Sequence, residues 1–83
     1  MQQYLITFRS LTHAQHAARL LERRGVTATV IRAPAGLSAA GCAYAVTLRR
    51  EPEEAVRWLR RQGVRVGKLF ERGADGVWTE VKM

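Results

Sequence analysis

The chain has 83 residues, of which 47% are hydrophobic and 25% are charged. This composition is that of an ordinary globular protein, and we expect one domain over residues 1–83. No apolar run approaches the ~18 residues that a membrane span needs, which excludes a membrane-spanning protein. A single cysteine cannot form an internal disulfide, which excludes a disulfide-stabilised secreted domain. We therefore expect a cytoplasmic protein.

The charge is strongly basic, with 14 basic and 7 acidic residues and a formal net charge of +7. A basic surface attracts nucleic acid, anionic substrates or acidic partner proteins. Twelve of the basic residues are arginines spread along the chain, which favours a solvated basic face over a dedicated phosphate site. One loose group stands out, formed by Arg49, Arg50, Arg57, Arg60, Arg61 and Arg65.

The first elements are a strand and a helix. Residues 4–8 are β-branched or aromatic in a short run, which predicts a strand. Ser10 and Thr12 both offer an N-cap for a helix over residues 11–24, and Gly25 ends it. The apolar stripe of this helix has the spacing i, i+3, i+4 and i+7, with Ala14, Ala17, Ala18 and Leu21.

Two further strands are expected over residues 26–31 and 43–48. The connection at residues 33–41 is rich in small residues, so the backbone can bend freely and approach other groups closely. Gly41 and the only cysteine, Cys42, lie where this connection enters the second of these strands. We expect the thiol there to be either exposed or half buried.

The second half of the chain repeats the helix–strand pattern. Pro52 begins a helix that Gly63 ends, and glutamates at its start favour the positive end of the helix dipole. A strand is expected over residues 64–71, followed by an Asp75–Gly76 turn and a closing strand over residues 77–81. The buried face of the helix is predicted to consist of Ala55, Val56 and Leu59.

The order strand, helix, strand, strand, helix, strand predicts an α+β fold, a ferredoxin-like βαββαβ sandwich. Two helices would cover one face of an antiparallel sheet, with an extra C-terminal β-strand. In this topology the connection at residues 33–41 lies at the sheet end where the first helix begins. Cys42 is therefore expected close to Arg9, Ser10, Thr12 and His13.

Two interpretations of Cys42 remain open. A helix N-terminus with an arginine and a histidine nearby would favour the thiolate, which is what a sulfur nucleophile or persulfide carrier requires. Alternatively, the cysteine is a small hydrophobic residue at the start of a strand, since free cysteines are among the most buried residue types.

Other site chemistry has little support. His13 and His16 have a spacing that can place two ligands on one metal, with Cys42 as a third, but no fourth ligand is evident. We expect a surface histidine pair and no metal or other cofactor. No Ser/His/Asp set, phosphate loop or carboxylate pair for acid–base work is present, so a non-enzymatic carrier or adaptor is favoured over an enzyme.

Nucleic-acid binding is the main alternative class. RNA-recognition domains share this fold and stack bases on aromatic residues of the two central strands. Here the corresponding strands carry only Tyr4, Phe8 and Tyr44, which we interpret as packing residues. We expect Trp78 to cover the open face of the sheet or to form a dimer contact, so a homodimer is left open.

The segment Thr7-Phe8-Arg9-Ser10-Leu11-Thr12-His13, with Pro34, Leu37-Ser38 and Gly41-Cys42, resembles a family of small bacterial proteins described as selenium/sulfur carrier-like. The resemblance extends over about residues 4 to 70. In this chain Arg9 stands where a histidine is common in the family, and the Cys-Gly order is reversed to Gly41-Cys42.

The resemblance implies a sulfur or selenium carrier, or a sulfur-relay adaptor, that holds the chalcogen on Cys42 as a persulfide-type adduct. Arg9, Ser10, Thr12, His13 and Gly41 would support the anionic sulfur, and donor or acceptor proteins would be the partners. The alternative is an RNA-binding or protein-interaction module with a structural cysteine. A metal-binding regulator that uses His13 and Cys42 comes third.

Overall fold

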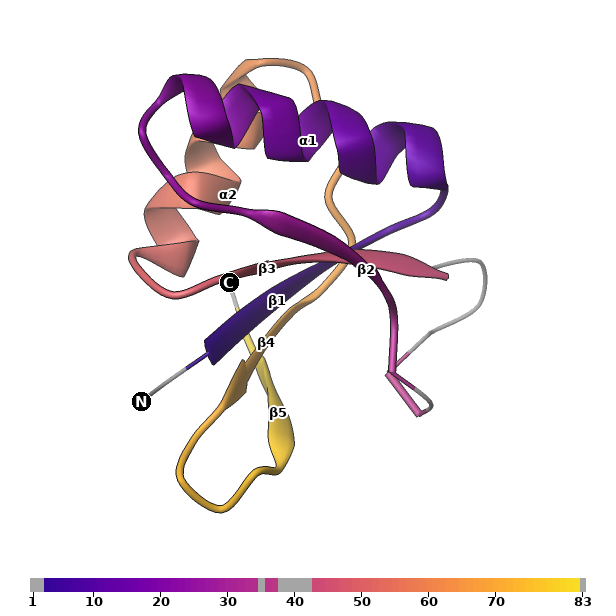
Figure 1. The fold of residues 1–83 in the computed structure, drawn as a ribbon, viewed down its shortest axis with the longest axis vertical. Coiled ribbons are helices and arrows are strands. Elements are labelled where there is room, and N and C mark those ends of the chain that lie inside the picture. Colours follow the sequence, from indigo (N-terminus) through magenta and orange to yellow (C-terminus); the bar gives the residue numbers. More distant parts are fainter. Residues whose placement is uncertain (1–2, 35, 38–42, 83) are drawn as a thin grey trace.

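A computed structural model describes residues 3–34, 36–37 and 43–82. The elements in chain order are β1 (Gln3–Phe8), α1 (Leu11–Arg23), β2 (Thr29–Arg32), β3 (Tyr44–Leu48), α2 (Pro52–Arg61), β4 (Leu69–Arg72) and β5 (Trp78–Val81). The strands form one antiparallel sheet in the order β2-β3-β1-β4-β5. Both helices lie on one face of it (Figure 1). The predicted α+β fold of ferredoxin-like type is confirmed, with β5 added beside β4.

The main core lies between the two helices and the sheet. The predicted apolar stripes are buried as expected: Ala14, Ala17, Ala18 and Leu21 of α1, and Ala55, Val56 and Leu59 of α2. They pack against alternate residues of the strands, including Ile6, Val46 and Leu69. The short alanine side chains allow the backbone of α1 to lie close to the sheet, which buries the larger strand residues completely. None of the helices in the described part of the chain is long and apolar enough to cross a membrane.

The connection after α1 corrects the predicted start of the second strand. Gly25 has φ +84°, and the N–H of Val26 donates to the carbonyl of Leu21 over 2.9 Å. This is a Schellman motif, in which the residue after the glycine closes the helix end. Val26 is therefore held by the helix, and β2 begins only at Thr29 rather than at residue 26.

The end of α2 repeats this arrangement. Gly63 has φ +80°, and the N–H of Val64 donates to the carbonyl of Leu59 over 3.0 Å. Val64 is buried in the main core. The strand predicted over residues 64–71 therefore begins later, at Leu69.

A β-bulge lies immediately before β4. The N–H of Thr7 donates to the carbonyl of Lys68, whereas the carbonyl of Thr7 accepts from the N–H of Gly67. Two residues thus oppose one, which interrupts regular pairing and bends the strand. The remaining donor, the N–H of Lys68, is bound by the Thr7 hydroxyl over 2.8 Å.

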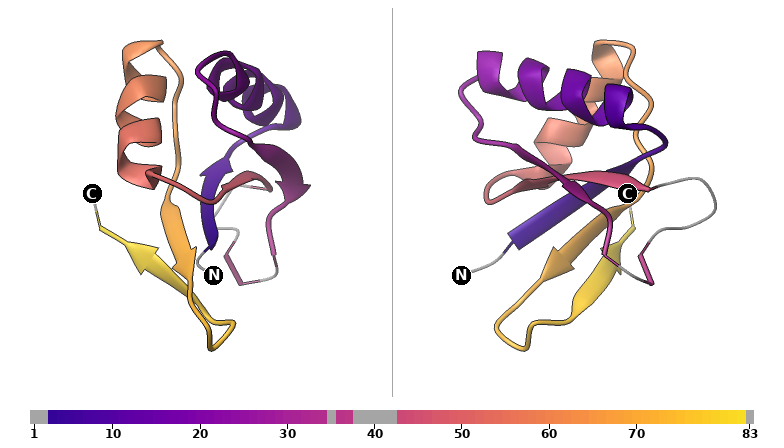
Figure 2. Two further views of the ribbon diagram at one scale, coloured as in Figure 1. Left: turned by 60° about the vertical axis from the view of Figure 1, so that its left-hand side comes forward. Right: turned by 45° about the vertical axis from the view of Figure 1, so that its right-hand side comes forward.

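The sheet face away from the helices carries a second, smaller core. Leu5, Ala45 and Phe70 are buried there, and Leu37 and Trp78 pack against them. In Figure 2 the β4–β5 hairpin and the segment leaving β2 both extend away from the helix layer. These two segments supply the side chains that cover this second face. Trp78 thus covers the open face of the sheet, which is one of its two predicted roles.

Candidate functional site

The start of α1 is formed by Ser10 and His13. The backbone of Ser10 is extended, and its Oγ accepts a hydrogen bond from the N–H of His13 over 3.2 Å. The same Oγ lies 2.7 Å from Nδ1 of His13, and either group can donate in this bond, depending on the protonation of the imidazole. Ser10 is therefore the N-cap, and its hydroxyl fixes the position of the His13 ring.

The other two predicted supporting residues in this region point their side chains to solvent. Arg9 follows β1 directly and is exposed, and Thr12 is exposed within the first turn of α1. Thr12 is thus not the cap, which settles the choice between the two candidates. His13 is also exposed, although its ring is bound to Ser10.

The electrostatics of this helix end favour a negative charge. The first turn of α1 contains no acidic residue. The N–H groups of a first helical turn lack partners within the helix, and the helix dipole adds about half a positive charge. An anionic group placed beside Ser10 would be stabilised by both effects. The arrangement can therefore hold or orient an anion.

Gly41 and Cys42 lie outside the described residues, as do residues 38–40. Backbone pairing positions the two described ends of the connection. The N–H of Ala33 donates to the carbonyl of Ala43 over 2.9 Å, and Tyr44 pairs with Phe8 of β1. Both ends of the connection therefore lie at the sheet end from which β1 runs into α1, as the topology predicted.

The first half of this connection is anchored to the second sheet face. The N–H of Leu37 donates to the carbonyl of Pro34 over 3.1 Å, which closes a turn. Gly36 in this turn has φ +88°, a conformation for which glycine is suited. Leu37 then packs against the buried Leu5, Ala45 and Phe70. This role of Leu37 was not predicted from the sequence, where its signal is an isolated large apolar residue in a run of small ones.

The aromatic residues of the central strands face the helices. Tyr4, Phe8 and Tyr44 all pack in or against the main core, as their interpretation as packing residues predicted. The opposite face, which an RNA-recognition domain would use, has Leu5 and Ala45 at the corresponding central positions. The described part of this face therefore presents no aromatic stacking platform on its two central strands.

His13 and His16 are both exposed on α1, as expected for a surface histidine pair. Within residues 3–34, 36–37 and 43–82, no three histidine, cysteine, aspartate or glutamate side chains gather closely enough to hold a metal ion. The described residues thus provide no ligand set for a resident metal.

The fold and the region around Ser10 define a small α+β protein of ferredoxin-like type with an anion-stabilising helix start beside a cysteine-bearing connection. A comparison with protein families identifies the particular class: the family model described as "Putative Se/S carrier protein-like" matches residues 3–71. The chain belongs to this family, and the match includes the whole range of the resemblance seen in the sequence, about residues 4 to 70. Searches of curated proteins and of solved structures gave no match.

Proposed function

We propose that this protein carries sulfur or selenium on Cys42 and passes it between partner proteins. Membership of the Se/S carrier-like family is the observation that carries the proposal. The chain contains one cysteine, so a chalcogen bound to a thiol has a single attachment point. A thiol without an internal disulfide partner suits a reducing compartment, and we place the protein in the cytoplasm.

The strand register supports a position for Cys42 beside the start of α1. Phe8 and Tyr44 are paired in the β1–β3 ladder. Ser10 follows Phe8 by two residues, and Cys42 precedes Tyr44 by two residues. We propose that the thiol lies within reach of the Ser10 hydroxyl and the free N–H groups of the first helical turn. These donors and the helix dipole would favour the thiolate.

The transfer step requires no oxidant. The Cys42 thiolate attacks the terminal sulfur of a donor persulfide, and a new sulfur–sulfur bond forms as the donor's own sulfur–sulfur bond breaks. The donor cysteine leaves as a thiolate, and Cys42 becomes the persulfide. Delivery to an acceptor is the same exchange in reverse. Selenium would follow the same step with a selenium–sulfur bond.

Each supporting residue has a separate role in this proposal. Ser10 and His13 would supply hydrogen bonds to the anionic sulfur, and their mutual bond would hold both in place. Arg9 would add positive charge in front of the helix. Thr12 is exposed in the first turn and would offer a further hydroxyl, and Gly41 would give the backbone beside Cys42 its freedom.

Mass spectrometry after incubation with a cysteine desulfurase and cysteine tests the proposal. The protein should gain the mass of one sulfur atom, and the gain should disappear on treatment with dithiothreitol. Cys42→Ser should show no gain, whereas Cys42 in the wild type should alkylate rapidly with iodoacetamide because the thiolate is favoured. A wild-type thiol that neither gains sulfur nor alkylates faster than free cysteine would show that the cysteine is structural.

A further inference from the structure

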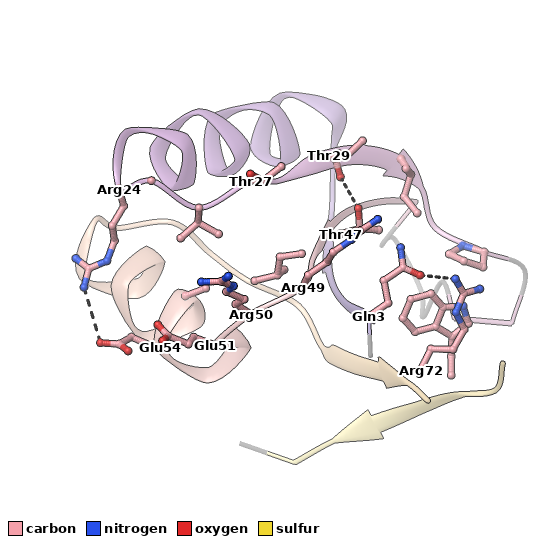
Figure 3. Close-up of a pocket in the computed structure, with 17 residues that line it drawn as sticks. Gln3, Arg24, Thr27, Thr29, Thr47, Arg49, Arg50, Glu51, Glu54 and Arg72 are labelled. Atoms are coloured by element: carbon pink, nitrogen blue, oxygen red, sulfur yellow. Dashed lines mark hydrogen bonds and ion pairs between the residues drawn. The ribbon is translucent and has the colours of Figure 1, made fainter. Parts of the chain in front are cut away.

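A groove of about 1020 Å³ runs across the second sheet face and the neighbouring end of α2. Its floor includes Gln3 of β1 and Thr47 of β3 (Figure 3). One side is formed by β2 and the residues that follow it, and the other by the β4–β5 hairpin. Of the described residues that line it, four are arginines and two are glutamates, so the groove is positively charged.

The side chain of Arg72 has two contacts in this groove. Its guanidinium is hydrogen-bonded to the side-chain carbonyl of Gln3 and lies 4.7 Å from the centre of the Trp78 ring. Both contacts are with uncharged groups. Arg72 forms no ion pair with any carboxylate of the described residues. Its half-buried positive charge is thus held in a fixed orientation and left without a counter-charge.

Two of the other three arginines, Arg24 and Arg50, differ in their pairing. Arg24 is paired with Glu54 at 3.8 Å, so the α2 end of the groove is largely neutralised. Arg50 is exposed on the connection from β3 to α2 and has no ion pair with a described carboxylate. Arg50 and Arg72 therefore leave an excess of positive charge across the middle and the hairpin side of the groove.

The shape and lining of the groove distinguish between possible ligand classes. Small-molecule sites are lined mainly by hydrophobic and aromatic side chains, whereas this groove is lined mainly by polar and charged residues from most elements of the fold. Single-stranded nucleic acid requires exposed aromatic faces for base stacking, and the Trp78 ring is already covered by the Arg72 guanidinium. A polypeptide with carboxylates needs neither feature, because planar guanidinium groups bind carboxylates directly.

We infer that this groove binds an acidic polypeptide segment of the protein that delivers sulfur or selenium to Cys42, or receives it. Arg72 and Arg50 bind its carboxylates, and the apolar patch of Ile31, Pro34 and Trp78 takes one aliphatic side chain. Pro34 lies near the start of the connection that leads to Cys42, so a segment bound here contacts the base of that connection. The identity of the partner rests on the proposed function.

Fluorescence anisotropy with a short, labelled, glutamate-rich peptide carrying one central leucine tests the inference. Arg50→Gln and Arg72→Gln should each weaken binding about five-fold, because each removes one guanidinium–carboxylate contact. Arg61→Gln is the matched control. It removes the same charge from an exposed position on the outside of α2, and it should weaken binding less than about two-fold. Far-UV circular dichroism checks that the Arg72 variant folds. If that variant does not fold, the variant of the exposed Arg50 tests the inference.

Two further probes locate and classify the binding. In ¹⁵N–¹H spectra, the peptide should shift the Thr47 amide and the Trp78 indole and leave the amides of residues 57–61 unchanged. The same peptide with glutamine in place of glutamate should bind at least about ten-fold more weakly. Equal losses in all three arginine variants, or no binding, would overturn the inference. If oligothymidylate of the same charge binds more tightly than the peptide and its binding depends on Arg72, the inference is overturned and the ligand of the groove is nucleic acid.

The groove and the carrier function can fail separately. Cys42→Ser should bind the peptide with the affinity of the wild type, because no groove residue is changed. Sulfur loading of Cys42 in a protein that does not bind the peptide would refute the groove alone. Peptide binding with the expected arginine dependence, without sulfur loading, would refute the carrier function and leave an acidic-peptide groove.

Discussion

Thr7 shows how one hydroxyl joins two strands at an irregular point of the sheet. It is 1% exposed, and its Oγ1 accepts from the N–H of Lys68, the donor that the β-bulge leaves without a backbone partner. The segment Thr7-Phe8 is part of the motif by which the chain resembles its family. Its threonine therefore has a structural explanation, independent of sulfur chemistry.

Replacement of Thr7 by valine should lower the free energy of unfolding by about 1–2 kcal/mol, because the shape is kept while the N–H of Lys68 loses its acceptor. Urea denaturation followed by circular dichroism measures this. Thr79→Val makes the same chemical change at an exposed position of β5 and should change stability by less than about 0.5 kcal/mol. Equal stability of the two variants would show that water satisfies the Lys68 N–H.

The role of a single residue could be predicted from the sequence where its contacts are with residues nearby in the chain. Ser10 caps α1 because a side-chain oxygen at that position can bind an N–H three residues later, which depends only on nearby sequence. The role of Thr7 depends on Lys68, 61 residues away, and on a bulge that forms only when the two strands meet. No pattern near Thr7 in the sequence contains that information.

At the level of elements, the start of α2 is strained. Glu51 is the N-cap and has φ +45°, a left-handed conformation that costs a non-glycine residue about 1–2 kcal/mol. Its side chain makes no capping hydrogen bond. Pro52 at the first helical position and Glu53 and Glu54 in the first turn favour the helix start instead.

Glu51→Gly should raise the free energy of unfolding by about 0.5 kcal/mol. Glycine removes the left-handed strain, and the greater entropy of the unfolded glycine offsets part of the gain. Glu53→Gly, two residues further along in the first turn of α2, should instead lower it by about 1 kcal/mol. Thermal unfolding by calorimetry measures both. Destabilisation by both substitutions would mean that Glu51 contributes more through its charge than it loses through its backbone.

The elements were predicted in type and order, and their starts were less accurate. Both late strand starts have the same cause, a Gly-Val pair after each helix that closes the helix end. The pair is visible in the sequence at Gly25-Val26 and Gly63-Val64, and the leucine five residues before each valine completes the pattern. Val26 and Val64 were assigned to the strands because valine has a high strand propensity. Propensity does not take into account the hydrogen bond from each valine to the end of its helix.

At the scale of the whole molecule, charge is the dominant feature. The formal net charge is +7, whereas the described ion pairs are two exposed contacts at 3.8 and 3.7 Å. Exposed pairs of this kind contribute about 0–1 kcal/mol each. Repulsion between arginines in the compact state should therefore outweigh the attraction within these pairs.

Sodium chloride should consequently stabilise the protein. An increase from about 0.05 M to about 0.5 M shortens the screening length several-fold and should raise the free energy of unfolding by roughly 0.5–1 kcal/mol in urea denaturation. Arg57→Glu lowers the net charge by two at an exposed position of α2 and should show a smaller salt effect. A decrease in stability with salt would mean that favourable charge pairs outweigh the repulsion.

The class of fold, the two helical faces, the helix ends and the sheet end with the cysteine-bearing connection could all be predicted from the sequence. These depend on periodicity, capping and chain connectivity, which are local or follow from element order. The folded structure was needed to show that Leu37 and Trp78 cover the second sheet face, and that Arg72 is bound by Gln3 with no carboxylate of the described residues paired to it. These features bring together residues distant in the chain, and they depend on how the strands twist and pair.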